Sequence, residues 1–173
     1  MDALRIRNKG IRRVRVADLE ESPWNFRTHP ESQRDALAGV ISELGFYGYP
    51  DVYETQSGNL RICDGHLRKE LLIATYGVDA EIDVNVTDFD EAEAKKATLT
   101  KDPLAAMATA DAGALDALLR EVDTGSEALQ QMLSQLAEDV GIVPPNFEPA
   151  SIDDQGKLDE KAKTTCPECG HSF

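Results

Sequence analysis

The sequence is poor in cysteine, in aromatic residues and in positive charge, and it has no long apolar run. Three cysteines in 173 residues do not suggest the disulfide framework of a small secreted protein. No apolar stretch approaches the roughly 20 residues of a membrane-spanning helix, and the first ten residues hold no apolar signal core. We therefore expect a soluble cytoplasmic protein with no membrane partner.

The deficit of positive charge is uneven along the chain. Acids outnumber bases 32 to 18, which gives a formal net charge of −14. A chain this acidic is unsuited to coating nucleic acid. Residues 1–27, however, carry seven bases against four acids, whereas residues 28–173 carry 11 bases against 28 acids. If DNA is a partner, the charges favour the basic N-terminal end as the part that binds it.

Short strand patterns and amphipathic helix patterns alternate over the first hundred residues, which predicts an α+β fold. Alternating or short apolar runs predict strands, and apolar residues three and four apart predict helices. The predicted strands are 11–16, 52–54, 60–63 and 82–86, and the predicted helices are 31–44, 66–76 and 90–99.

Beyond Pro103 only helical patterns remain. Two amphipathic segments, 115–122 and 129–140, flank Gly125 and Ser126, and Ser126 is suited to cap the second helix. We therefore divide the chain into four parts. They are an α+β domain, a helical hairpin, a polar linker and a short tail, at residues 1–102, 103–143, 144–163 and 164–173.

The segment 60–68, Leu-Arg-Ile-Cys-Asp-Gly-His-Leu-Arg, holds the residues best suited to a functional site. A strand ends there, Gly65 permits a sharp turn, and a helix begins whose first N–H groups are unpaired and suited to anions. Arg68 can add a bidentate contact to a phosphate, and His66 can donate a hydrogen bond or move a proton. Asp64 can take a Mg²⁺ ion bound to the phosphates. Asp64 and His66 are therefore the candidate catalytic residues.

The same residues also fit an ordinary strand–turn–helix corner. In that interpretation Asp64 only caps the helix, Gly65 only turns the chain, and Arg68 is a solvated surface residue. The residues by themselves leave both interpretations open.

From about residue 11 to residue 99 the layout resembles the ParB N-terminal domain, which shares its fold with sulfiredoxin. The resemblance rests on the order of the elements and on three motifs. These are the Leu19-x-x-x-Pro23-x-x-x-Arg27 loop, the helix ending in Leu44-Gly45, and Asp64-Gly65-His66-x-Arg68 where ParB proteins usually have Gly-Glu-Arg-Arg. The implied fold is a small mixed sheet with helices.

In the family that this layout resembles, the turn binds nucleotide phosphates. ParB binds CTP with Mg²⁺ and becomes a DNA clamp, sulfiredoxin uses ATP, and other members phosphorylate free serine or are described as nucleases. By resemblance, Gly65, His66 and Arg68 would contact the phosphates and Arg27 would help. The implied ligand is CTP or ATP with Mg²⁺, which is then hydrolysed or used for phosphoryl transfer.

The chain departs from the family at three places. Sulfiredoxin has its reactive cysteine where this chain has His66, and Cys63 precedes the turn. ParB has a Glu-Asn pair that helps to hold metal where this chain reads Leu-Thr-Lys-Asp at 99–102. Residues 104–143 are too few and too acidic for the helix-turn-helix DNA reader of ParB. What remains resembles compact ParB-like proteins of phages and mobile elements, which implies a role in DNA metabolism or regulation.

Two other functions stay open. A ParB-like nuclease would need a carboxylate cluster that holds metal beside a scissile phosphate, and Asp64 alone is a poor one. A non-catalytic adaptor would use its helices or tail to recruit a DNA-modifying enzyme, and the apolar stripes of 115–140 would also suit a homodimer face. Trp24 and Phe26 could stack on a base, but we expect them to cover the core.

The tail resembles one knuckle of a zinc ribbon. Cys166, Cys169 and His171 stand in the pattern Cys-Pro-Glu-Cys-Gly-His, and such a turn lets two thiolates face one Zn²⁺ ion. A closed structural site needs four ligands, so a partner chain or a longer chain would have to complete it, or the tail is a remnant of such a site.

Overall fold

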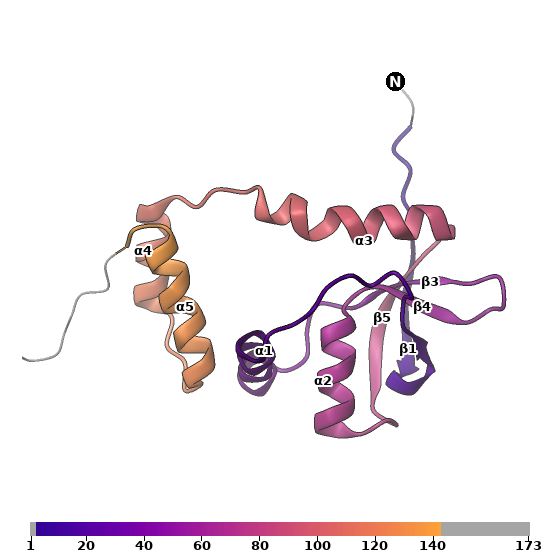
Figure 1. The fold of residues 1–173 in the computed structure, drawn as a ribbon, viewed down its shortest axis with the longest axis horizontal. Coiled ribbons are helices and arrows are strands. Elements are labelled where there is room, and N and C mark those ends of the chain that lie inside the picture. Colours follow the sequence, from indigo (N-terminus) through magenta and orange to yellow (C-terminus); the bar gives the residue numbers. More distant parts are fainter. Residues whose placement is uncertain (1–2, 143–173) are drawn as a thin grey trace, which may run out of the picture. The chain divides into compact units, whose positions relative to one another are not determined.

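The computed structural model describes residues 3–142, which form a five-stranded mixed sheet and five α-helices (Figure 1). The α+β class and the small mixed sheet predicted from the sequence are therefore confirmed. None of the described helices is long and apolar enough to cross a membrane. The predicted zinc ligands Cys166, Cys169 and His171, like the predicted linker, lie outside the described residues.

The sheet has the strand order β1-β5-β3-β4-β2. Strands β3 and β4 form the predicted antiparallel hairpin, with Val52 opposite Ile62. Strand β5 runs parallel to β3 and antiparallel to β1, and β2 runs parallel to β4. The strands are β1 (Asn8–Arg15), β2 (Leu19–Glu20), β3 (Asp51–Glu54), β4 (Leu60–Asp64) and β5 (Glu81–Thr87).

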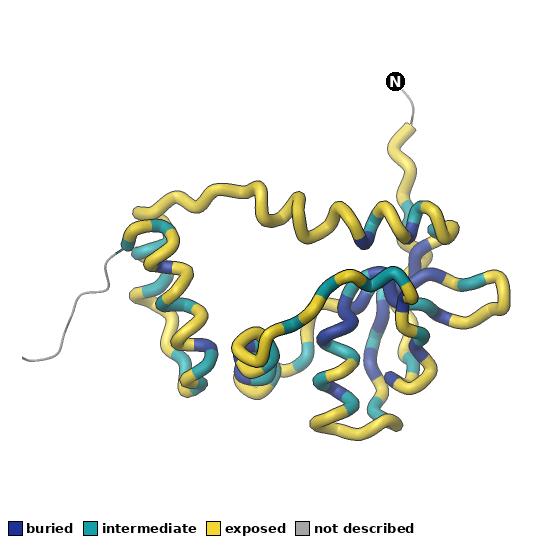
Figure 2. The backbone as a smooth tube through the Cα atoms, in the orientation of Figure 1, coloured by how far each residue is buried: buried dark blue, intermediate teal, exposed yellow. Residues whose placement is uncertain are grey.

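Both faces of the sheet are covered by helices. Each strand contributes side chains to both faces, because neighbouring residues point to opposite sides. On one face Val52 and Ile62 are fully buried and pack with Leu72 of α2 (His66–Tyr76). On the other face Tyr53 and Cys63 pack with Ala94 of α3 (Glu91–Ala106). Figure 2 shows the buried positions gathered on the strands and on the sides of the helices that face them.

Of the two loop aromatics, only Trp24 covers the core. Its ring centre lies 6.4 Å from that of Tyr53, and the Lys95 ammonium lies 4.8 Å from the Trp24 ring centre. The expectation for Phe26 is wrong, since this side chain is 58% exposed. It lies under the Arg27 guanidinium instead, at 5.2 Å from the ring centre.

Helices α1 (Glu31–Leu44) and α2 have the predicted bounds, whereas α3 is longer than predicted. Asp90 begins α3 with a capping box, in which Asp90 and Glu93 each accept the other's backbone N–H. The helix then runs through Pro103 to Ala106 and so crosses the boundary predicted between residues 102 and 103. The proline costs one backbone hydrogen bond but does not end the helix.

Helix α5 (Glu127–Asp139), which follows α4 (Ala112–Glu121), packs against α1. Ser126 caps α5 as predicted, accepting the Leu129 N–H at 3.3 Å. Glu43 at the end of α1 accepts the Ser126 N–H at 2.9 Å. Gly39 permits the close approach of the two helices, because a Cβ atom there would lie 2.8 Å from the Ser126 Cβ.

We expect Gly39→Ala to loosen α5 from α1. Alanine favours a helix by up to about 1 kcal/mol over glycine, but overpacking costs about 1–3 kcal/mol, so the clash with Ser126 should dominate. Hydrogen exchange should become faster in α5 while the β3–β5 strands keep their protection. The second change Ser126→Gly should restore protection, because it removes the atoms that the new methyl group meets. Unchanged exchange in Gly39→Ala would contradict this packing.

Candidate functional site

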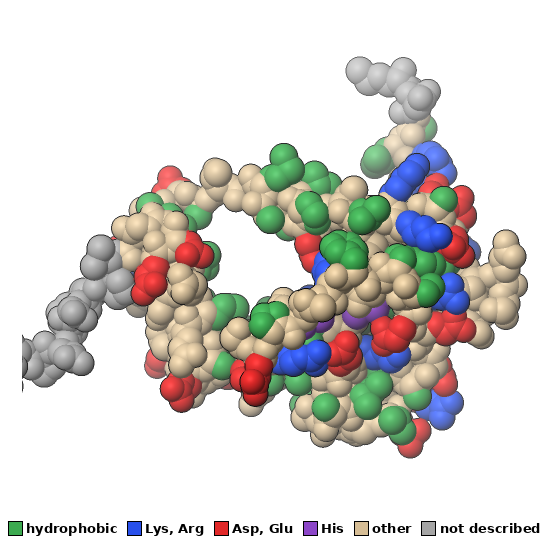
Figure 3. All heavy atoms as spheres, in the orientation of Figure 1, with side chains coloured by type: hydrophobic (Ala, Val, Ile, Leu, Met, Phe, Trp, Pro, Cys, Tyr) green, Lys and Arg blue, Asp and Glu red, His purple; other side chains and the backbone are tan. Residues whose placement is uncertain are grey.

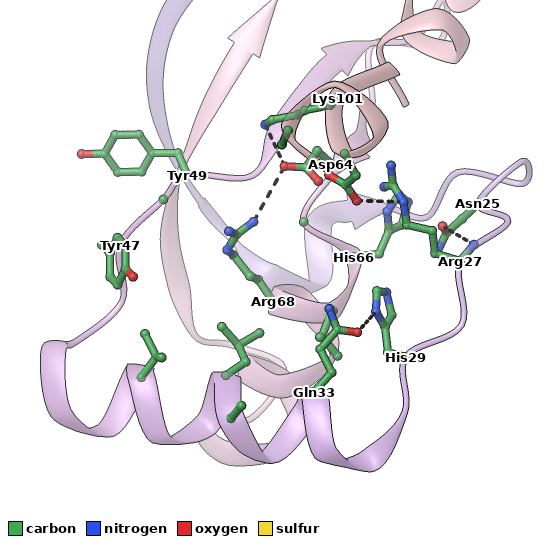
Figure 4. Close-up of a pocket in the computed structure, with 18 of the residues that line it drawn as sticks. Asn25, Arg27, His29, Gln33, Tyr47, Tyr49, Asp64, His66, Arg68 and Lys101 are labelled. Atoms are coloured by element: carbon green, nitrogen blue, oxygen red, sulfur yellow. Dashed lines mark hydrogen bonds and ion pairs between the residues drawn. The ribbon is translucent and has the colours of Figure 1, made fainter. Parts of the chain in front are cut away.

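A pocket of about 590 Å³ opens at the start of α2. Its lining comes from the loop before α1, from α1 itself, from the segment before β3, from the β4–α2 turn, from three residues of α3 and from one residue of α5. It contains all five residues that the sequence analysis selected for the nucleotide: Arg27, Asp64, Gly65, His66 and Arg68 (Figure 4). The fold therefore brings the residues of the loop and the turn to one place.

The turn itself is built by Gly65 and Pro50. Gly65 has φ 103°, a left-handed conformation that side chains disfavour. A Cβ atom on Gly65 would lie 2.9 Å from the Pro50 Cβ, so the space also requires glycine. Among residues 3–142 no side chain caps the first turn of α2. Its first N–H groups therefore stand at the pocket with the positive end of the helix dipole.

Asp64 does not cap α2, contrary to the simple corner interpretation. Its Oδ2 atom accepts a hydrogen bond from the Lys101 ammonium of α3 at 2.8 Å and lies 3.8 Å from the Arg68 guanidinium. Burial opposes ionisation of Asp64, but Lys101, with Arg68 and Arg27, outweighs burial and lowers the pKa of this carboxyl group. Asp64 is therefore an ionised partner of the site's cations.

Lys101 also bonds to Asp51 at the start of β3, at 2.6 Å. Burial would lower the pKa of its ammonium, but the hydrogen bonds to Asp51 and Asp64 outweigh burial and raise that pKa. Asp51 in turn accepts a hydrogen bond from the Asn85 amide at 2.7 Å on its other oxygen. A permanent positive charge thus lies between two carboxylates at the edge of the pocket.

The described residues do not fit a Mg²⁺ ion held by the protein at this turn. Mg²⁺ needs oxygen ligands at about 2.0–2.1 Å, and the Oδ2 atom of Asp64 already faces Lys101 and Arg68. Across residues 3–142, no three histidine, cysteine or acidic side chains are grouped so that they could hold a metal. The metal-binding role suggested for Asp64 is therefore not supported by its surroundings.

Arg27 is held in place by α3. Its Nε atom lies 2.9 Å from an Asp102 oxygen, and one terminal nitrogen donates to the Thr98 carbonyl at 2.8 Å. The side chain is only 15% exposed, yet it lines the pocket. The guanidinium is therefore positioned before any ligand arrives.

The side chain of His66 is buried, at 3% exposure of the residue. Its Nε2 atom accepts the Ser22 N–H at 3.4 Å and lies 3.7 Å from Glu21. Burial lowers the pKa of the imidazole, and the negative charge of Glu21 only partly offsets this. A neutral ring whose Nε2 accepts a hydrogen bond keeps Nδ1–H as its donor.

The sequence analysis did not select several lining residues with polar or aromatic side chains, among them Lys101 on α3, and Tyr47 and Tyr49, which flank Gly48. Lys101 falls in the stretch 99–102, where the sequence departs from the ParB pattern. The departure is visible in the sequence, but it assigns no function to Lys101. The tyrosines follow α1 in an irregular segment, where no periodicity marks them.

Cys63 takes no part in the site. It is 1% exposed, and burial raises the pKa of its thiol to about 12. Since the thiolate is the reactive form, the sequence interpretation of Cys63 as a small buried residue is confirmed.

The basic N-terminal end is largely neutralised by nearby acids. Arg7 bonds to Glu93 of α3 at 2.6 Å, Arg13 bonds to Asp83 of β5 at 2.8 Å, and Arg15 bonds to Asp18 at 2.7 Å. These ion pairs reduce the positive charge that this end offers to DNA.

The buried His66 should make folding stability fall with acid. Its pKa is lowered in the folded state, so the unfolded chain binds the proton more readily, and stability should drop as pH falls below about 6.5. In His66→Gln this part of the pH dependence should disappear, whereas His29→Gln, a control at a half-buried histidine, should keep it. Urea midpoints between pH 7.5 and 5.5 measure the effect, and equal slopes in all three proteins would contradict it.

The sequence matches no family model, and no curated protein matches it significantly. The structure is similar to the C-terminally truncated chromosome-partitioning protein ParB from Caulobacter crescentus complexed with CTP-gamma-S. The TM-score is 0.52 at 18% identity, over 76% of this chain and 74% of that one. A Pnob8-like ParB-N domain is similar at TM-score 0.42 and 14% identity, over 75% of this chain and 48% of that one. The described part of the chain therefore has a ParB-like fold.

Proposed function

We propose that this protein binds a nucleoside triphosphate, CTP or ATP, with the phosphates at the first turn of α2. One observation carries the proposal. The uncapped start of α2, turned by the left-handed Gly65, opens into a pocket of about 590 Å³. That volume lies within the range of small-molecule sites. Helix N-termini of this kind are suited to phosphate groups.

The charges of the pocket support an anionic ligand. Arg27, Arg68 and Lys101 line it, against the carboxylates of Asp64 and Asp102. Arg68 is one third exposed and projects into the pocket beside Gly48. Its guanidinium can form the paired hydrogen bonds that phosphate oxygens accept.

The pocket also has apolar lining suited to a nucleoside. Ala36, Leu37 and Val40 of α1 contribute to it, together with Tyr47 and Met132. These apolar and aromatic groups can bury a base, while the polar groups at the α2 turn orient the phosphates. A protein of the same fold was solved with CTP-gamma-S, which also supports a nucleotide.

A reaction on the nucleotide, hydrolysis or phosphoryl transfer, would depend on positioning and charge stabilisation by Arg27 and Arg68. Neither candidate catalytic side chain is poised as a strong base. The carboxylate of Asp64 has a lowered pKa, and the Nε2 atom of His66 already accepts a hydrogen bond. We therefore propose nucleotide binding as the main activity and catalysis as a secondary one. The proposed setting is phage or mobile-element DNA metabolism or regulation.

A nuclease finds no support in residues 3–142, because they gather no carboxylate cluster. The adaptor alternative is favoured by one observation. Leu99, Leu104 and Met107, on and just beyond the second half of α3, are all more than half exposed, and Figure 3 shows apolar side chains gathered along this helix. If no nucleotide shifts the melting temperature and a DNA-modifying enzyme co-purifies stably with the chain, the adaptor function is favoured.

We expect CTP or ATP with MgCl₂ to raise the melting temperature. A ligand at 100 times its Kd stabilises the folded state by about 2.7 kcal/mol, which a thermal-shift assay detects as several degrees. In Arg68→Ala the Kd should rise about 10- to 100-fold, because a hydrogen bond to a charged group contributes about 1.5–3 kcal/mol.

Arg12→Ala is the matched control, since Arg12 is exposed on β1 and outside the pocket lining. It should bind like the wild type. If no nucleotide shifts the melting temperature at millimolar concentration, the proposed function is wrong.

A further inference from the structure

The cation at the mouth of the proposed phosphate site is already supplied by the chain. We propose that Lys101 takes the place of a divalent metal, so that this site binds a nucleoside triphosphate without Mg²⁺. The inference rests on the proposed function and concerns the charge that accompanies the ligand at the same site.

The position of Lys101 carries the inference. Its Nζ atom donates to Asp64 at 2.8 Å and to Asp51 at 2.6 Å, and its side chain lines the pocket. An ammonium has three N–H donors, and these two carboxylates use two of them. The third donor is available for a phosphate oxygen while the first two hold the ammonium in place.

The carboxylates beside Lys101 are poorly placed to bind a metal as well. The Oδ2 atom of Asp64 faces both Lys101 and Arg68, at 2.8 and 3.8 Å. The two oxygens of Asp51 accept from Lys101 and Asn85. A Mg²⁺ ion at either carboxylate would lie close to an ammonium of like charge, and at Asp51 it would compete with the hydrogen bonds that both oxygens accept.

Lys101 also removes a repulsion that would otherwise oppose the ligand. Asp64 lies at the residue directly before the turn, so its negative charge is next to the proposed phosphate position. The ion pair with Lys101 offsets that charge, and the guanidinium groups of Arg27 and Arg68 line the pocket beside it. Without the ammonium, Asp51 and Asp64 would form a carboxylate pair suited to Mg²⁺.

The test is isothermal titration of the full chain with CTP and with ATP, each in EDTA and in 5 mM MgCl₂. The wild-type Kd for the nucleotide that binds should differ by less than about threefold between the two buffers. Lys101→Ala should lose about tenfold or more in EDTA, which corresponds to 1.4 kcal/mol. Mg²⁺ should restore part of that loss, because it can bridge the exposed carboxylates and the phosphates.

Two further variants keep the result interpretable. Lys96→Ala makes the same change on the exposed side of α3, outside the pocket lining, and should bind like the wild type in both buffers. Lys101→Gln keeps an N–H donor on a slightly shorter side chain but removes the charge. It should lose affinity in EDTA as Lys101→Ala does, and its melting temperature reports whether the fold is kept.

The possible failures are distinct. Wild-type binding that requires Mg²⁺, or Lys101 variants that bind normally in EDTA, would overturn the role of Lys101 and leave nucleotide binding intact. If neither nucleotide binds the wild type in either buffer, the proposed function fails and the role of Lys101 fails with it.

Discussion

The contact between Gly65 and Pro50 is the constraint on which the site depends. A left-handed residue without a Cβ atom lets β4 end and α2 begin directly against the proline. Any side chain at this position would meet the Pro50 ring and would also strain the backbone. Because the turn is this tight, the first N–H groups of α2 face the pocket, and Asp64, Gly65, His66 and Arg68 come to lie around one point.

Ionic contacts from α3 complete the arrangement. Lys101 bonds to Asp64 and Asp51, and Asp102 holds Arg27, so consecutive residues of one helix bind both the turn and the loop before α1. These contacts place three cations around the pocket while pairing them with carboxylates that would otherwise repel an anion. The pocket therefore gathers cations that three carboxylates balance, although the whole chain carries a formal net charge of −14.

Local signals explain why much of the fold could be predicted. The bounds of α1 and α2 follow from apolar periodicity and from the glycines that end them, and the β3–β4 hairpin follows from two short apolar runs around a glycine turn. The errors arise where packing overrides a local signal. Pro103 stays within α3, and Phe26 is exposed under Arg27.

The class of fold, the turn at Gly65 and the pocket residues Asp64, His66 and Arg68 beside it could be read from the sequence, because the three residues lie with Gly65 in one strand–turn–helix segment. The environment of Asp64 became visible only in the folded chain. Lys101 is 37 residues away from it along the chain and reaches it because α3 packs across one face of the sheet. No periodicity or motif encodes such a meeting, since it depends on how two distant elements pack and on the charges that they bring together.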